Sequence, residues 1–182
     1  MTEQDSIVAS RTGGALGGSS APAPKPDYYL HSEGILTSAK PCTIMTILGS
    51  CVAVCLWEPR GGIGGMNHYL LPHELRPEAR AGRFGSTAIQ LLIGRLEALG
   101  CRRIELRAKV FGGACINGLW RNDRLNLGRK NVEAAFATLE REGIPVIGHD
   151  VGGGAGRKVL FQTSDGTAWV KKFREGSDGT RR

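Results

Sequence analysis

Short apolar runs that end at glycines limit the fold of this chain more than any other feature. The chain contains 27 glycines among 182 residues, roughly twice the usual share of about 7%. A short apolar run bounded by turn-forming residues is typical of a buried β-strand. Two longer segments, 84–99 and 129–142, instead repeat apolar residues at helical spacing and are followed by Gly100 and Gly143. The sequence therefore predicts many short strands and two main helices.

The predicted strands lie on both sides of the two helical segments. They do not alternate one by one with helices, as they would in a doubly wound parallel sheet. We therefore predict an α+β fold built in layers, in which two main helices pack on a mostly antiparallel or mixed sheet. The turn Ser164-Asp-Gly-Thr167 is expected to join the last two strands as a hairpin. The predicted strands are Ile44–Leu48, Val52–Trp57, Met66–Leu71, Ile104–Phe111, Ile144–Val151, Lys158–Thr163 and Ala168–Phe173.

One domain flanked by two tails accounts for the length of the chain. With 41% apolar and 23% charged residues, the chain is long enough for one core and too short for two ordinary domains. Residues 1–27 are rich in Gly, Ser and Pro and have too little apolar surface to offset the entropy of ordering, so we predict a disordered tail there. The domain is expected over residues 28–174, and residues 175–182 are expected to form a short basic tail.

The chain carries no signal for a membrane or for secretion. Its apolar runs fall far short of the roughly 20 residues that span a bilayer, and its first residues lack the basic and hydrophobic regions of a secretory signal. We therefore expect a cytoplasmic protein without membrane insertion. Its cysteines are odd in number and irregular in spacing, so we expect free thiols rather than disulfides or zinc ligands. They are Cys42, Cys51, Cys55, Cys101 and Cys115.

The net charge of +7 is spread along the chain rather than concentrated. Nucleic-acid-binding proteins usually carry a basic stripe interleaved with aromatic residues, so we expect no nucleic-acid partner; an acidic protein partner fits a diffuse charge equally well. The glycine-rich segments 61–65, 112–113 and 152–156 lack both the Gly-Lys-Ser/Thr of a phosphate loop and the GxGxxG pattern. They are therefore expected to serve as turns and close backbone approaches, and we expect neither a cofactor nor a metal.

Cys51 and His68 are the residues that most suggest catalysis. Cys51 follows Gly49-Ser50, which lets the backbone turn sharply and present both the sulfur and free amides. A nucleophilic cysteine also needs a base within hydrogen-bond reach. His68 lies seventeen residues later in an apolar run, where a histidine is either a base or a core residue satisfied by hydrogen bonds. From the residues alone both interpretations stay open. The other histidines, His31, His73 and His149, are expected in loops.

Five separate segments, in order and covering nearly the whole domain from Tyr28 to Phe173, resemble one family. The segments are Leu48-Gly-Ser-Cys-Val-Ala-Val-Cys-Leu56, Gly65-Met-Asn-His-Tyr-Leu-Leu-Pro72, Lys109-Val-Phe-Gly-Gly-Ala114, Asn126-Leu-Gly-Arg-Lys-Asn131 and Asp150-Val-Gly-Gly-Gly154. In these five segments the chain resembles the chemoreceptor glutamine deamidases, CheD. It departs from the family near Leu30-His-Ser-Glu-Gly34, where a Pro-Gly-Glu order is expected, and at Gly85-Ser86, where the family has Gly-Asp.

The resemblance implies a fold, an activity and a set of catalytic residues. The fold is a layered α/β sandwich related to the cysteine-hydrolase domains of deamidating bacterial toxins. The activity is conversion of glutamine side chains on chemoreceptors to glutamate through a cysteine thioester, which supports adaptation in chemotaxis. The family's nucleophile and base fall on Cys51 and His68, and its third catalytic residue matches Thr46 best, with Thr43 as a weaker candidate.

Other functions remain compatible with the same residues. The thiol could also attack a glutamyl methyl ester, which would make the protein a receptor methylesterase, or pass the acyl group to an amine, as a transglutaminase does. Family members can also pair with a CheC-type phosphatase, so the chain could act mainly as a regulatory binding partner with little catalysis.

Overall fold

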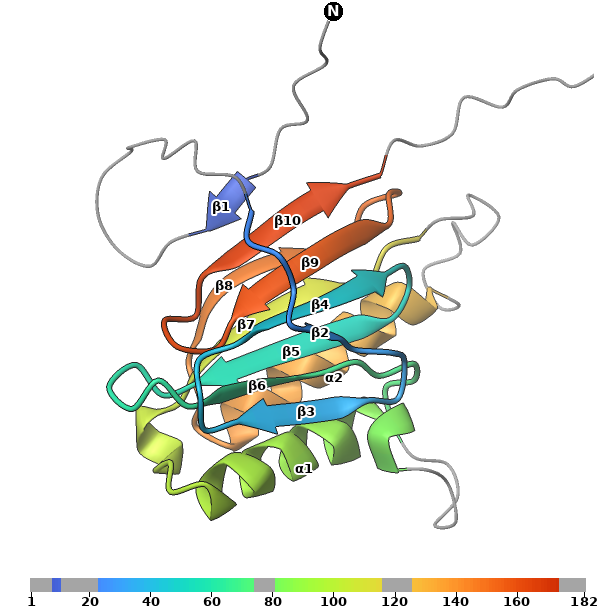
Figure 1. The fold of residues 1–182 in the computed structure, drawn as a ribbon. Helices are drawn as coiled ribbons and strands as arrows, with labels where there is room; N and C mark the ends of the chain where they lie inside the picture. The colour runs from blue at the N-terminus through green and yellow to red at the C-terminus, as the bar shows by residue number, and fades with distance from the viewer. Residues whose placement is uncertain (1–7, 11–22, 74–80, 116–125, 174–182) are drawn as a thin grey trace, which may run out of the picture.

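The computed structural model describes residues 8–10, 23–73, 81–115 and 126–173. Within these residues the chain forms two five-stranded sheets, with the strand orders β1-β10-β9-β4-β2 and β3-β6-β5-β7-β8 (Figure 1). The first sheet is antiparallel except where β2 meets β4, and the second is antiparallel except where β7 meets β8. The strands are β1 (Val8–Ser10), β2 (Tyr28–Tyr29), β3 (Ile35–Ser38), β4 (Thr43–Leu48), β5 (Val52–Trp57), β6 (Gly64–Asn67), β7 (Arg107–Gly112), β8 (Val146–Val151), β9 (Arg157–Gln162) and β10 (Ala168–Lys172).

Two α-helices, α1 (Gly85–Ala98) and α2 (Leu127–Arg141), cover one face of the second sheet. Helix α1 packs against β3, β5 and β6, and α2 packs against β5, β7 and β8. The molecule is thus three layers deep, with helices, second sheet and first sheet stacked in that order (Figure 1). This confirms the predicted α+β architecture and places both helices within two residues of their predicted ends.

Strand β5 lies between the two hydrophobic cores. Its six residues are all buried, because the helices cover one of its faces and the first sheet covers the other. Val52, Val54 and Leu56 face the helices, and the alternating residues Ala53 and Cys55 face the first sheet. Burial on both faces explains why this strand reads as a continuous apolar run rather than an alternating one.

The predicted strand over 104–111 is partly wrong. Residues Arg103–Glu105 form a 3-10 turn instead, and the strand begins only at Arg107. Ile104 has 68% of its surface exposed, whereas Leu106 is buried in the core. The apolar spacing of Ile104 and Leu106 resembles that of a strand, but only Leu106 finds a surface to pack on.

The ends of the domain lie partly outside the described residues. The disordered tail predicted over 1–27 falls largely on residues 1–7 and 11–22, and the basic tail over 175–182 falls entirely outside, so both stay predictions. Within the described part, residues 8–10 form β1 and pair with β10. Asp27 also accepts a hydrogen bond of 2.7 Å from the backbone N–H of Thr43, so the ordered contacts of the domain include a residue before 28. No helix among the described residues has the length and apolarity that crossing a bilayer requires.

Candidate active site

Thr46 and His68 come together between the two sheets. Thr46 lies in β4 of the first sheet, and His68 directly follows β6 of the second. Both are buried, and Thr46 Oγ1 lies 2.8 Å from His68 Nδ1. The same hydroxyl donates a hydrogen bond of 2.8 Å to the carbonyl of Leu30. The sandwich therefore joins two of the three predicted site residues across its interior.

These hydrogen bonds determine which imidazole nitrogen carries the proton. A threonine hydroxyl has one proton, and Thr46 donates it to the Leu30 carbonyl. The oxygen can therefore meet Nδ1 only as an acceptor, so Nδ1 is protonated and donates to Thr46. In the neutral ring Nε2 is then unprotonated, and this buried nitrogen has no hydrogen-bond partner among the described residues. His68 is thus oriented as a base with Nε2 available.

The backbone of His68 is held by a bulge beside β3. Its N–H donates to the Gly34 carbonyl at 3.0 Å, and its carbonyl accepts from the Glu33 N–H at 2.7 Å. Glu33 has a φ of 66°, in the left-handed region that side-chain-bearing residues seldom occupy. The segment that departs from the family pattern therefore adopts the unusual conformation that holds His68. The prediction of a strand through Leu71 is wrong here, because β6 ends at Asn67.

Cys51 lies where the chain crosses from the first sheet to the second, immediately before β5. Tyr69 pairs with Val52 through two backbone hydrogen bonds. In this antiparallel register Cys51 and His68 are diagonal neighbours on one face, a relation in which backbone positions are commonly about 7–8 Å apart and side chains can meet. Cys51 is partly buried against the core between the sheets. The register therefore brings the predicted nucleophile to the same face as the predicted base.

Burial shifts the pKa values of both groups toward their neutral forms. It lowers the pKa of His68 to about 4, against a smaller opposing effect of the Leu30 carbonyl. Burial also raises the pKa of the Cys51 thiol, while the backbone N–H of Cys51 itself, which hydrogen-bonds the sulfur, acts in the opposite direction. Burial therefore favours a neutral thiol at Cys51 and a neutral imidazole at His68.

Two glycines let the end of β7 close on the Cys51 segment. Gly113 donates its N–H to the Cys51 carbonyl at 2.8 Å, and Ala114 donates to the Gly49 carbonyl at 2.8 Å. Gly112 has a φ of 109°, and a Cβ added there would lie 2.2 Å from the Cys51 carbonyl oxygen. At this position only glycine combines the backbone angle with the close approach.

The weaker candidate and the other histidines lie elsewhere. Thr43 donates to Gln162 Oε1 at 2.6 Å instead of reaching His68. His31 contacts the Tyr29 ring, and His73 lines a separate recess beside α2. His149 contacts the Phe136 ring from within β8, so its predicted place in a loop is wrong. Of the predicted residues, the structure thus joins Thr46 and His68 directly and brings Cys51 to the same face.

Sequence reasoning gave no role to Asn131. This residue lies on the buried face of α2 and is fully buried. Its Nδ2 donates to the Ser50 carbonyl and to the Leu70 carbonyl, each at 2.9 Å. The signal that could have found it is an asparagine at helical spacing with Ala134, Ala135 and Leu139, because a carboxamide on an apolar helix face needs buried partners.

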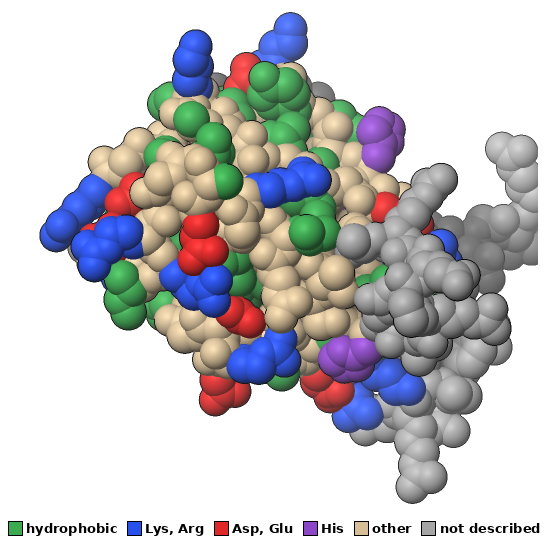
Figure 2. Space-filling view, turned by 90° about the horizontal axis from the view of Figure 1, so that it is seen from below, with side chains coloured by type: hydrophobic (Ala, Val, Ile, Leu, Met, Phe, Trp, Pro, Cys, Tyr) green, Lys and Arg blue, Asp and Glu red, His purple; other side chains and the backbone are tan. Residues whose placement is uncertain are grey.

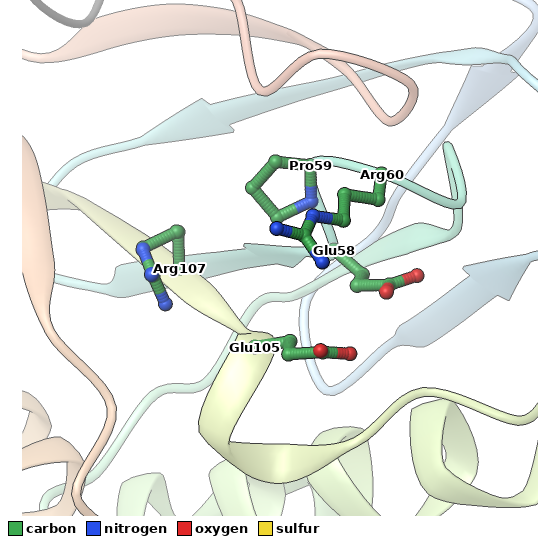
Figure 3. A pocket seen from close by; sticks show the side chains of 5 residues that line it. All are labelled: Glu58, Pro59, Arg60, Glu105 and Arg107. Carbon is green, nitrogen blue, oxygen red and sulfur yellow. The ribbon is translucent and has the colours of Figure 1, made fainter.

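Two recesses differ in their relation to the site. One, of about 300 Å³, is lined by residues that include Gly113, Cys115 and Gly153, and so adjoins the Cys51 segment. Another, of about 210 Å³, is lined by Glu58, Pro59, Arg60, Glu105 and Arg107 (Figure 3). The second recess lies beyond the end of β5 that is far from Cys51. Strand β5 has six residues, and at a rise of about 3.3 Å per residue its length separates this recess from Cys51 by about 20 Å. Of these two recesses, the first therefore adjoins the candidate site and the second does not.

Charged residues of both signs mix on the side of the molecule that the helices cover (Figure 2). Arg103 pairs with Glu97 of α1 at 3.0 Å and with Glu142, after the end of α2, at 2.7 Å. On this face, acidic side chains therefore lie among the basic ones.

Comparisons with known proteins agree on one family. The family model described as CheD chemotactic sensory transduction matches residues 70–172. A protein of Anaeromyxobacter dehalogenans named probable chemoreceptor glutamine deamidase CheD 1 is 44% identical over 95% of this chain and 100% of its own length. A Sulfurimonas denitrificans protein named probable chemoreceptor glutamine deamidase CheD is 38% identical over 79% of this chain and 92% of its own.

A solved structure, the Bacillus licheniformis hypothetical protein YfiH, matches 75% of this chain and 60% of its own length, with a TM-score of 0.40 and 14% identity. This similarity is too low to support any conclusion about the chain. The family model begins two residues after His68, so the three predicted site residues rest on the geometry described above. The relatives, in contrast, extend over most of the chain. By its family model and by relatives aligned over nearly their whole lengths, the chain belongs to the CheD family.

Proposed function

We propose that this protein is a chemoreceptor glutamine deamidase in which Cys51 is the nucleophile, His68 the general base and acid, and Thr46 the residue that orients His68. The observation that carries the proposal is the hydrogen-bonded chain from the Leu30 carbonyl through Thr46 to Nδ1. It leaves Nε2 unprotonated and without a hydrogen-bond partner among the described residues. The names of the relatives supply the substrate class, a glutamine side chain of a chemoreceptor.

The first half of the reaction forms a thioester. Nε2 takes the proton of the Cys51 thiol as Sγ attacks the carboxamide carbon of the substrate glutamine. The carboxamide oxygen becomes an oxyanion, and the backbone N–H of Cys51 would donate a hydrogen bond to it. The imidazolium then protonates the leaving nitrogen, ammonia departs, and the glutamyl group stays bonded to sulfur.

The second half releases glutamate. Water enters where ammonia left, and Nε2 takes its proton as the oxygen attacks the thioester carbonyl. The C–S bond breaks, the proton returns to sulfur, and the enzyme is restored with its thiol. Thr46 accepts from Nδ1–H in both halves and stabilises the imidazolium that forms in each.

The proposal also specifies surroundings and partners. The substrate glutamines would lie on the cytoplasmic helices of the receptor, which places the reaction in the cytoplasm. The five cysteines are all free thiols, as a reducing compartment requires. A CheC-type phosphatase is a second proposed partner, which would bind this protein and modulate its action on the receptor.

Co-expression with a receptor fragment tests the activity directly. We expect a one-dalton increase at specific glutamines and an equivalent release of ammonia. Cys51→Ala should abolish both, and His68→Asn, which cannot carry a proton, should slow turnover by at least about 10²-fold. Cys115→Ala, at another partly exposed cysteine, is the matched control and should leave the rate near that of the parent.

The same variants separate deamidation from the alternatives. A Cys51→Ala protein that still converts the receptor would exclude Cys51 as the nucleophile. A Cys51→Ala strain with undiminished chemotaxis would indicate that the protein acts as a binding partner rather than as an enzyme. Methanol release from a methylated receptor would reveal esterase activity at the same thiol.

A further inference from the structure

The buried carboxamide of Asn131 needs a physical explanation. Asparagine is less favourable than alanine within a helix, and burial of a carboxamide without partners costs free energy. Asn131 is nevertheless fully buried in the interior of α2, on the face that packs against the second sheet. Tyr69 Oη also donates to the backbone carbonyl of Asn131 at 2.6 Å, which fixes this turn of the helix against the segment after His68.

The carboxamide lies between two strand ends that cannot bond to each other. Beyond the Val52–Tyr69 pair, the carbonyls of Ser50 and Leu70 both accept from Asn131 Nδ2, at 2.9 Å each. Two carbonyl oxygens cannot share a hydrogen bond without a donor between them. A primary amide supplies two N–H groups from one atom, whereas serine or threonine would supply one and aspartate none. Asparagine thus completes the β5–β6 junction where the backbone ladder stops.

The contact with Ser50 also orients the amide of Cys51. The carbonyl of Ser50 and the N–H of Cys51 belong to one peptide unit, and no peptide bond among the described residues is cis. In a trans peptide the C=O and N–H point in opposite directions. Because Asn131 holds the Ser50 carbonyl, the Cys51 N–H is directed away from α2.

The carbonyls on either side of Ser50 accept hydrogen bonds from a different part of the chain. Those of Gly49 and Cys51 accept from Ala114 and Gly113, beyond the end of β7. Asn131 therefore holds the middle of three successive carbonyls, and without it the Ser50–Cys51 peptide would be free to rotate between two fixed neighbours. On the other side, Leu70 lies two residues after His68, so one side chain contacts the segments of both the predicted nucleophile and the predicted base.

We infer that Asn131 is a positioning residue of the active site. It orients the Ser50–Cys51 peptide, and with it the Cys51 N–H that is proposed to donate to the oxyanion, and it holds the Cys51 and His68 segments in register. The catalytic part of this inference rests on the proposed function. The structural part, an effect on the reactivity of the Cys51 thiol, does not depend on any substrate.

Alkylation of Cys51 by iodoacetamide, followed by mass spectrometry of the Cys51 peptide over a range of pH, tests the inference without a receptor. In Asn131→Asp, a near-isosteric change, the two donors are lost. We expect the alkylation rate at neutral pH to fall at least about tenfold, with its pH profile displaced to higher pH, because a rotated peptide no longer stabilises the thiolate. With receptor present, kcat should fall by at least about tenfold while KM stays within a few-fold.

Thr138→Ala is the matched control, since Thr138 is buried on the same face of α2 two turns later. It should lower the melting temperature without changing Cys51 alkylation or kcat. Should Asn131→Asp fail to fold, Asn131→Ser, which keeps one donor, replaces it and should show an intermediate loss of alkylation rate.

The inference is overturned if an Asn131 variant is destabilised as Thr138→Ala is but alkylates Cys51 at the parental rate and pH. This result is distinct from failure of the proposed function, which would appear as receptor conversion that survives Cys51→Ala while the alkylation results for Asn131 still hold.

Discussion

At the scale of single residues, the hydroxyl of Thr46 has the clearest consequence. It accepts a hydrogen bond from His68 Nδ1–H and donates one to the Leu30 carbonyl, so its removal leaves a buried ring N–H without this acceptor. Leaving a buried donor unsatisfied costs about 1–3 kcal/mol. Thr46→Val keeps the shape of the side chain and removes only the oxygen.

We therefore predict that Thr46→Val lowers kcat by about 10- to 100-fold. Thr43→Val, in the same strand but bonded to Gln162, is the control and should keep kcat within a few-fold of the parent. The measurement is ammonia release from a receptor fragment. A Thr46→Val enzyme with a parental kcat would mean that Leu30 or the fold alone orients the imidazole.

His68 should also make the stability of the protein depend on pH. The pKa of an unfolded histidine is about 6.5, and burial lowers that of His68 to about 4. Between these values the unfolded chain binds a proton that the folded chain does not. The free energy of unfolding therefore decreases as pH falls from about 6.5 toward about 4, by roughly 3 kcal/mol in total.

Urea unfolding at about pH 7 and about pH 5 should therefore show a loss of roughly 2 kcal/mol from this group. His68→Asn removes the titration and should reduce the difference by that amount. His31→Asn, at an exposed histidine, controls for loss of an imidazole elsewhere. An unchanged difference in His68→Asn would show that His68 remains accessible to protons in the folded state.

At the scale of elements, one glycine in β7 and one in α1 affect stability in opposite ways. Gly112 ends β7 with a positive φ against the carbonyl of Cys51, whereas Gly94 lies exposed in α1 with nothing within 4 Å of an added Cβ. The first is required by close backbone approach. The second only weakens its helix, because glycine is less favourable than alanine by about 1 kcal/mol in a helix interior.

The same change at these two sites should thus have opposite signs. Gly94→Ala should raise the free energy of unfolding by about 0.5–1 kcal/mol. Gly112→Ala should lower it by several kcal/mol and slow Cys51 alkylation, since the Cys51 carbonyl must move away. Chemical denaturation of the two variants provides the comparison, and a Gly112→Ala variant with parental stability and parental Cys51 alkylation would show that β7 does not constrain the Cys51 segment.

At the scale of the whole molecule, one buried arginine ties the two sheets together. Arg157 begins β9 of the first sheet and is 1% exposed. Its guanidinium donates to the Asp150 carboxylate at 2.7 Å and to the carbonyls of Asp150 and Gly152, in and after β8 of the second sheet. The link lies next to the site, because Arg157 pairs with Leu48, at the end of β4.

We predict that Arg157→Met lowers the free energy of unfolding by about 3 kcal/mol, because buried carbonyls lose their donors and a desolvated pair is broken. Lys172→Met removes another cation from the same Asp150, at 3.2 Å, but its side chain is 57% exposed. That control should change the free energy by less than about 1 kcal/mol. Equal losses in the two variants would mean that charge alone, and not the buried hydrogen bonds, holds the sheets together.

Local signals in the sequence determined most of the elements. The helices over 84–99 and 129–142 follow from apolar spacing and a closing glycine, and the Val52–Trp57 strand and the final hairpin follow from short apolar runs between turn residues. These patterns act over a few neighbouring residues, so they are readable without a fold. These patterns gave wrong predictions at Ile104 and after Asn67. At both places the contacts with neighbouring elements, and not the local sequence, determine whether the backbone continues as a strand.

The tertiary structure alone decided how the site is assembled. The residues suggested Cys51 and His68, and the family resemblance added Thr46, with Thr43 as a weaker candidate. Only the structure shows that Thr46 contacts His68 and that Thr43 contacts Gln162. Contacts between residues far apart in the chain determine three further features. These are the tautomer of His68, the hydrogen bonds of Asn131 and the contact of Gly112 with Cys51. Hydrogen bonds between sheets are set by strand order and register, and these follow from packing of the whole domain rather than from any local run of residues.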